Sequence, residues 1–144
     1  MAALSDTIAA EVASPVPDRL ENYDVGPREG PVVLCLHGLL DSCYHWGQQE
    51  AQVTGPLVTL GFRVVAASCR GHGGSSKHYD PALYGHKLVE DQLRLLDALQ
   101  VDTVHLVGYS MGAEIALALT VRHPDYGNKI HPPRLNKNCL YPLQ

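Results

Sequence analysis

Apolar residues gather in continuous runs that are separated by segments rich in glycine, proline and polar residues. The run at 32–36 is apolar at every position, and the segments 62–67 and 103–107 are mostly apolar, with Arg63, Thr103 and His105 as their polar positions. A strand that is apolar at every position is buried on both faces, which is typical of a parallel sheet covered by helices on both sides. We therefore expect three buried strands, with a short edge strand at residues 20–25.

Helical segments are predicted after each buried strand. Residues 46–60 are weakly periodic, and Gly55 with Pro56 is expected to kink or interrupt a helix there. Pro81 can open the next helix, and residues 110–123 are predicted to form the last. The helix after Pro81 carries apolar side chains at near-helical spacing, namely Val89, Leu93, Leu96 and Leu99. This alternation of strands and helices predicts an α/β fold with a doubly wound, mostly parallel sheet and right-handed crossovers.

The two ends of the chain lack this alternation. Residues 1–19 contain Pro15 and Pro17, which prevent a continuous helix, so we expect a poorly ordered leader there. Residues 126–144 are rich in proline and asparagine and are expected to form an irregular tail. The folded domain is therefore predicted at residues 20–125, and a chain of 144 residues is long enough for a single hydrophobic core.

Composition and charge exclude some classes of function. The net charge of -4 and the lack of a cluster of basic residues argue against nucleic acid as a partner. No apolar run reaches the roughly 18 residues that a membrane-spanning helix needs, and residues 1–14 contain no basic residue that could start a secretory signal. We therefore expect a soluble cytoplasmic protein. Its four cysteines form no CxxC pair, which favours reduced, buried thiols over disulfides.

The most specific motif is G-x-S-x-G, formed by Gly108, Ser110 and Gly112 between a predicted strand and a predicted helix. A serine at such a bend has a strained backbone that exposes its hydroxyl group, and the glycines keep side-chain atoms out of the crowded turn. The amide of Met111 then lies at the positive end of a helix, where it can stabilise an oxyanion. The alternative is a serine that only caps the helix.

Two further loops follow the other predicted buried strands. His37 and Gly38 end the first strand, at the sheet edge where the Ser110 bend is also expected, so an amide of this loop can be a second oxyanion donor. His37 could equally brace the loop through hydrogen bonds. The segment 69–76 is rich in glycine, but it lacks the third glycine of a dinucleotide-binding loop and is not followed directly by a helix. A structural loop and no cofactor are expected there.

Together these motifs resemble those of the α/β-hydrolase superfamily, in its serine-nucleophile form, over residues 20–125. They match the family's HG oxyanion motif, its RGHGxS loop and its nucleophile elbow, at His37-Gly38, at Arg70-Gly71-His72-Gly73 with Ser75, and at Gly108-Tyr109-Ser110-Met111-Gly112. The resemblance implies that Ser110 is the nucleophile and that the backbone amides of Leu39 and Met111 form the oxyanion hole. The reaction it implies is carboxylesterase-like, with an ester, thioester, lactone or amide as the acyl substrate. Ser68 stands where family members often carry aspartate.

The catalytic acid and the base histidine of that family follow the nucleophile, on loops after later strands. No later strand is predicted here, and Asp125 and His131 lie too far along the chain to return easily to Ser110. The histidines upstream, His72, His78 and His86, would reverse the family's order, although convergent triads do permit other orders. A metal site formed by His37, Asp41 and His45 is not expected, because the loop at Gly38 disfavours a closed set of ligands.

Two functional hypotheses follow. The first is a serine hydrolase whose chain is truncated after the helix at 110–123, so that it is weakly active or inactive. The second is a protein without catalytic activity, a remnant or isoform that binds a partner or a second copy through the sheet edge left unpaired by missing strands.

Overall fold

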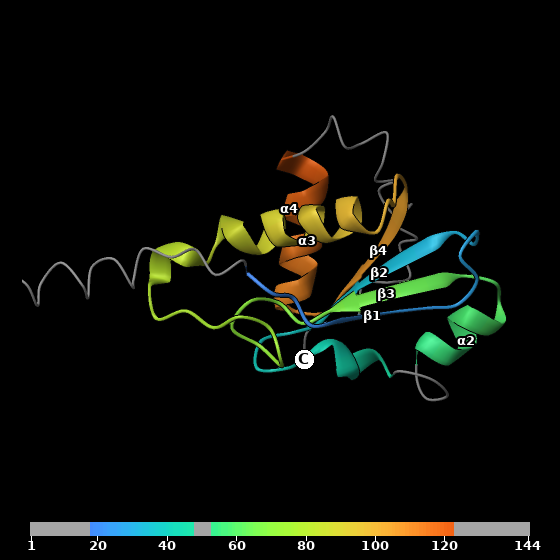
Figure 1. Ribbon diagram of the computed structural model, residues 1–144, viewed down its shortest axis with the longest axis horizontal. Coiled ribbons are helices and arrows are strands. Elements are labelled where there is room, and N and C mark those ends of the chain that lie inside the picture. Colours follow the sequence, from blue (N-terminus) through green and yellow to red (C-terminus); the bar gives the residue numbers. More distant parts are fainter. Residues whose placement is uncertain (1–17, 48–52, 123–144) are drawn as a thin grey trace, which may run out of the picture.

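Residues 18–47 and 53–122 are described by the computed structural model shown in Figure 1. The predicted tail at 126–144 and residues 1–17 of the predicted leader lie outside these ranges. Four strands form one open sheet in the order β1-β3-β2-β4. They are β1 (Asn22–Val25), β2 (Val32–Leu36), β3 (Arg63–Ala67) and β4 (Val104–Gly108). Strand β2 pairs in parallel with β3 and β4, and β1 pairs antiparallel with β3 at one edge.

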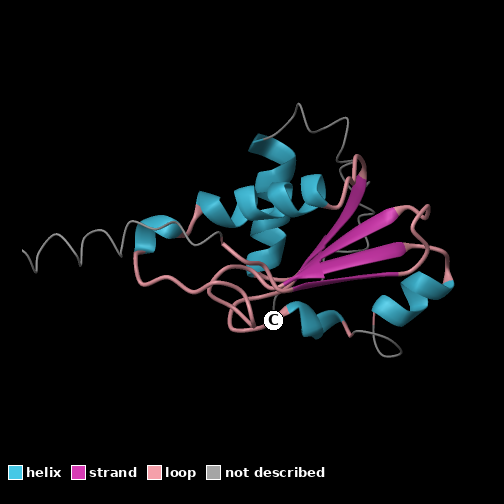
Figure 2. Ribbon diagram, in the orientation of Figure 1, coloured by secondary structure: helices cyan, strands magenta, loops and turns pink. Residues whose placement is uncertain are grey.

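Helices cover both faces of the sheet, as Figure 2 shows. The long helices α3 (His86–Ala98) and α4 (Met111–Arg122) lie on one face, while the 3-10 turn η1 (Cys43–Trp46) and α2 (Thr54–Thr59) lie on the other. Side chains of β2 point alternately to the two faces of the sheet. Leu34 packs with α3 and α4 on one face, whereas Val33 and Cys35 pack with Trp46 on the other. The predicted α/β fold with a mostly parallel sheet is confirmed.

Three of the predicted helix and strand boundaries are wrong. Pro81 opens only a 3-10 turn, η2 (Pro81–Leu83). Gly85 has a φ of 61°, which is not a helical conformation, so the helix α3 begins only after it. Gly55 and Pro56 do not interrupt α2 but lie in its first turn, where a proline costs no hydrogen bond. Residues 43–46 form the separate turn η1, ahead of the predicted start of that helix.

Strand β4 is also less buried than its apolar sequence predicts. Val104 and Leu106 are buried beneath α3 and α4, but His105 on the opposite side is exposed. Strand β4 is an edge of the sheet within the described residues, since its pairing there is with β2 alone. Among the described residues, η1 and α2 therefore cover the centre of this face of the sheet and leave the side of β4 that carries His105 uncovered.

The described cysteines and helices agree with two sequence-based predictions. Cys35, Cys43 and Cys69 are buried free thiols, and burial raises the pKa of Cys35 and of Cys69 to about 12. Thiols of such high pKa are protonated and unreactive at neutral pH. Over residues 18–47 and 53–122, no helix combines the length and the apolarity needed to cross a lipid bilayer.

Candidate active site

Ser110 lies at a sharp bend between β4 and α4. Its φ of 51° is in the left-handed region, which costs a serine on the order of 1–3 kcal/mol and persists only where neighbouring contacts enforce it. Those contacts are backbone hydrogen bonds on both sides of the bend. The Tyr109 amide donates to the Leu36 carbonyl oxygen at 3.0 Å, and the Ala113 amide donates to the Ser110 carbonyl oxygen at 2.9 Å. Ser110 itself is exposed at the surface of the protein.

Close packing of α4 against the end of β2 requires glycine at the start of the helix. A Cβ atom at Gly112 would lie 2.0 Å from the carbonyl oxygen of Leu36, far inside van der Waals contact. A Cβ atom at Gly108 would in turn lie 2.4 Å from the carbonyl oxygen of Gly112. Both glycines of the G-x-S-x-G motif are therefore needed to bring the bend and the helix this close to the neighbouring strand.

The loop after β2 touches the same bend. A Cβ atom at Gly38 would lie 2.8 Å from Cδ1 of Tyr109 and 3.5 Å from Cβ of Ser110. Beyond it, Leu39 and Leu40 are 66% and 91% exposed, and Leu40 has a φ of 62°. The carboxyl ends of β2 and β4 thus bring together the two loops that the sequence analysis placed at one edge of the sheet.

The candidate oxyanion donors are the amides of Leu39 and Met111. Met111 is the first residue of α4, where helix amides have no partner within the helix and the helix dipole is positive. Among the hydrogen bonds of residues 18–47 and 53–122, neither amide donates to a protein acceptor.

His37 braces the loop from inside the protein. Its side chain is fully buried, with Nδ1 2.7 Å from the carbonyl oxygen of Gly38 and Nε2 accepting a hydrogen bond from the Cys69 amide at 2.9 Å. This pattern fixes a neutral tautomer with the proton on Nδ1, and burial lowers the pKa of the ring. Because both ring nitrogens are occupied by backbone groups, His37 is not free to ligate a metal with Asp41 and His45. No cluster of metal ligands is found in the described part of the chain.

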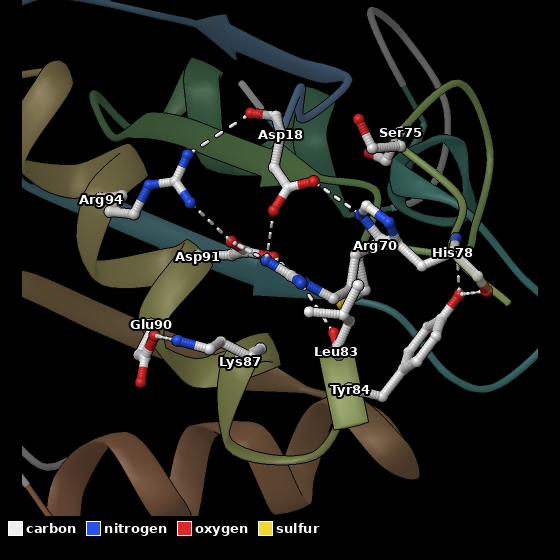
Figure 3. Close-up of polar contacts among 12 residues, drawn as sticks. Asp18, Arg70, Ser75, His78, Leu83, Tyr84, Lys87, Glu90, Asp91 and Arg94 are labelled. Carbon is white, nitrogen blue, oxygen red and sulfur yellow. Dashed lines mark hydrogen bonds and ion pairs between the residues drawn. The ribbon is translucent and has the colours of Figure 1, made fainter. Parts of the chain in front are cut away.

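The loop that follows β3 is held by a buried ion pair, drawn in Figure 3. Arg70 is 2% exposed and binds the fully buried Asp91 of α3 through Nε at 2.7 Å and Nη2 at 2.8 Å. Its remaining donors reach Asp18 and the carbonyl oxygen of Leu83. Asp91 raises the pKa of the guanidinium group, which stays charged. The loop is thus fixed to α3 and to the segment before β1 through the Arg70 side chain.

Ser68 links that loop to the chain before β1. Its hydroxyl group donates to the Glu21 carboxylate at 2.7 Å and accepts from the Cys43 amide at 3.0 Å. Glu21 also accepts the Gly74 amide at 2.8 Å, and this backbone hydrogen bond is the main cause that lowers the pKa of Glu21. Ser68 therefore joins the loop after β3, the turn η1 and the segment before β1 through one hydroxyl group and one carboxylate.

The upstream histidines have partners other than Ser110. His72 places Nδ1 3.1 Å from the Arg70 carbonyl oxygen, and His78 places Nε2 2.6 Å from the Asp18 carboxylate. His86 lies on the exposed side of α3, 3.5 Å from Glu90. Asp125 and His131 lie outside the described residues.

Sequence reasoning missed one group beside the bend. The His45 ring stacks on the ring of Tyr109 with 5.4 Å between centroids and 12° between planes. Its Nδ1 is 2.5 Å from the carboxylate of Asp41, whose pKa is lowered first by the Ser42 amide and then by His45. The spacing of Asp41 and His45 was visible in the sequence, but nothing in it indicated that Tyr109 would cover the imidazole.

Comparison with known proteins identifies relatives of this arrangement. The family model described as alpha/beta hydrolase fold matches residues 31–130. Epoxide hydrolase B of Mycobacterium tuberculosis is 37% identical over 99 residues, which are 68% of this chain and 27% of that protein. A serine hydrolase-like protein of Danio rerio is 35% identical over 119 residues, 81% of this chain and 35% of that protein.

Solved structures agree with the sequence relatives. A thioesterase domain from the curacin biosynthetic pathway matches with a TM-score of 0.66 and 34% identity, covering 76% of this chain and 38% of that domain. This chain therefore spans well under half the length of each relative that it matches.

Proposed function

Because the chain belongs to the α/β-hydrolase family, we propose that Ser110 is the nucleophile of an acyl transfer to water, with an ester, thioester, lactone or amide as substrate. The observation that supports this most directly is the left-handed bend at Ser110, with Gly38 of the opposite loop against it. A hydroxyl nucleophile needs an electrophilic carbonyl carbon and donors for the negative charge that develops on the carbonyl oxygen. We propose that the amides of Leu39 and Met111 are these donors.

In the proposed reaction the Ser110 oxygen attacks the carbonyl carbon, and its proton passes to a base. The carbonyl oxygen becomes negatively charged and accepts hydrogen bonds from the amides of Leu39 and Met111. Each donor of this kind contributes about 10²–10³ in kcat in enzymes with an oxyanion hole. The positive end of α4 adds to the same stabilisation.

We expect this activity to be weak when residues 18–122 supply the site alone. Their histidines at 72, 78 and 86 contact the Arg70 carbonyl oxygen, Asp18 and Glu90, and no hydrogen bond between a histidine and Ser110 is found within residues 18–47 and 53–122. A serine hydrolase that lacks a triad member retains on the order of 10³–10⁴-fold acceleration over water through its oxyanion hole and substrate binding. Slow acylation of Ser110 is therefore the expected behaviour.

A fluorophosphonate probe tests the proposal, because it labels serine hydroxyl groups that lie in an oxyanion hole. The purified chain is incubated with the probe, and the labelled residue is identified by mass spectrometry. We expect labelling at Ser110, and its loss in Ser110→Ala. A folded protein that stays unlabelled at Ser110 through long incubation excludes the hydrolase function for this chain.

Association through the sheet edge is a second candidate function, favoured by the surface of β4 and α4. Strand β4 has an open edge within the described residues, and Leu117 and Val121 of α4 are 65% and 66% exposed. Open edges and apolar surfaces of this kind recruit other chains. Size-exclusion chromatography with light scattering tests this. A mass that stays monomeric up to high concentration contradicts self-association, and Val121→Lys should reduce any dimer observed.

A further inference from the structure

Asp41, His45 and Tyr109 form a contact chain between the loop after β2 and the bend at Ser110. The Asp41 carboxylate accepts a hydrogen bond from Nδ1 of His45 at 2.5 Å, and the imidazole lies nearly parallel to the Tyr109 ring. Tyr109 directly precedes Ser110 in the chain. The side chains of His45 and Asp41 are 33% and 39% exposed, so this group lies at the surface rather than in the core.

The outer part of the loop after β2, at Leu39 and Leu40, is poorly packed, so a contact from a neighbouring side chain can hold it in place. Leu39 and Leu40 are largely exposed, and they bury little apolar surface that could hold the loop in place. The Asp41 amide closes a turn onto the Gly38 carbonyl oxygen at 3.3 Å, which is a long and weak hydrogen bond. An oxyanion donor works only when it is held near its required position, within about 0.5 Å.

We propose that His45 is a positioning residue that sets the distance between the Leu39 amide and Ser110. This inference rests on the proposed function of Ser110. Asp41 belongs to the turn that carries Leu39, and its carboxylate fixes the plane of the His45 ring. The ring in turn is held on Tyr109, whose amide is tied to the Leu36 carbonyl oxygen at the end of β2. The two halves of the oxyanion hole are thereby joined by side chains as well as by the sheet.

Two contacts of the His45 ring carry this role, the hydrogen bond to Asp41 and the stack on Tyr109. A pair of stacked rings keeps its geometry when imidazole is replaced by phenyl, whereas alanine removes the contact. The rate of fluorophosphonate labelling at Ser110 is therefore measured for wild type, His45→Ala and His45→Phe. Tyr44→Ala is the matched control, because it removes an exposed aromatic ring from the adjacent position of η1.

We expect His45→Ala to label about 10- to 100-fold more slowly, which is the effect of displacing a catalytic donor by roughly 1 Å. His45→Phe keeps the stack but loses the hydrogen bond to Asp41, so it should label at a rate between those of His45→Ala and wild type. Tyr44→Ala should label like wild type, and the thermal midpoints should stay close together. Equal slowing by His45→Phe and His45→Ala overturns the proposal in favour of His45 as a base. Wild-type rates in His45→Ala overturn it as well.

A second measurement separates this inference from the function on which it rests. In ¹H–¹⁵N spectra, His45→Ala should shift the amide signals of Leu39 and Leu40, while Tyr44→Ala should leave them in place. If the wild-type protein is never labelled at Ser110, the proposed hydrolase function fails, and these signals alone decide whether His45 positions the loop. Unchanged Leu39 and Leu40 signals in His45→Ala refute the positioning role in either case.

Discussion

Removing the carboxylate of Asp91 is the most informative perturbation of the fold. The change Asp91→Ala leaves the guanidinium group of Arg70 charged and 2% exposed, with its bonds to Asp18 and to the Leu83 carbonyl oxygen. Two charge-assisted hydrogen bonds, at 2.7 and 2.8 Å, are lost. Figure 3 shows that the loop after β3 and helix α3 meet at this pair.

The expected cost follows from the burial of the pair. Removing one partner of a buried ion pair costs about 3–5 kcal/mol when the other charge stays buried without compensation. Asp18 still pairs with Arg70, so we expect a cost near the lower end, about 3 kcal/mol. Asp18→Ala should cost only about 1 kcal/mol, since the Asp18 side chain is 23% exposed and its loss leaves Arg70 bound to Asp91. Replacing both partners, with Arg70→Met and Asp91→Leu, should restore much of the stability lost in Asp91→Ala.

Urea unfolding followed by tryptophan fluorescence measures these differences, because Trp46 is the single tryptophan of the chain and is 6% exposed. Asp91→Asn keeps one carbonyl acceptor for Arg70 and should fall between wild type and Asp91→Ala. The reasoning is refuted if Asp91→Ala costs less than Asp18→Ala. It is also refuted if the double replacement is less stable than Asp91→Ala.

Three further predictions concern the bend, the core and pH. Gly112→Ala should slow fluorophosphonate labelling by about 100-fold, because its Cβ atom would lie 2.0 Å from the Leu36 carbonyl oxygen and push the start of α4 away; unchanged labelling contradicts this. Gln92→Leu should stabilise the fold by about 1–3 kcal/mol in urea unfolding, since the Gln92 side chain is fully buried and its polar atoms have no partner in the described residues; a loss of stability contradicts this. The pKa of Asp24 is held below 3.8, chiefly by the hydrogen bonds of Arg63, so the pair stabilises the fold above about pH 4 and the gain is lost as pH falls through the lowered pKa. Asp24→Asn should therefore be less stable than wild type near pH 6, with the difference narrowing towards pH 3.

The strands and the bend were predictable because they depend on near neighbours in the chain. The run at 32–36 is apolar at every position, and the structure forms β2 over those same residues, buried throughout. The two glycines around Ser110 likewise predicted a tight strand-to-helix turn, which the structure has at φ 51°. The roles of Ser110, Leu39 and Met111 in catalysis stay predictions until labelling tests them.

Two of the predictions failed for different reasons. The segment 103–107 predicted a strand buried on both faces, yet His105 is exposed because, among the described residues, η1 and α2 cover only the centre of the sheet. The residue types alone do not state which neighbours will be near. The helix start at Pro81 failed for a local reason, because Gly85 ends the turn that Pro81 opens and α3 begins at His86.

By itself, the sequence determined the order of strands and helices, the parallel sheet covered by helices and the bend at Ser110. The spacing of apolar residues and the glycines at a turn are local properties of a chain, and these features depend on them. Tertiary structure alone decided which side chains meet. Asp18 binds Arg70 across 52 residues, Glu21 binds Ser68 across 47, and His45 stacks on Tyr109. Ion pairs and ring contacts between such distant residues depend on how the loops approach one another in space, and no spacing along the chain encodes that approach.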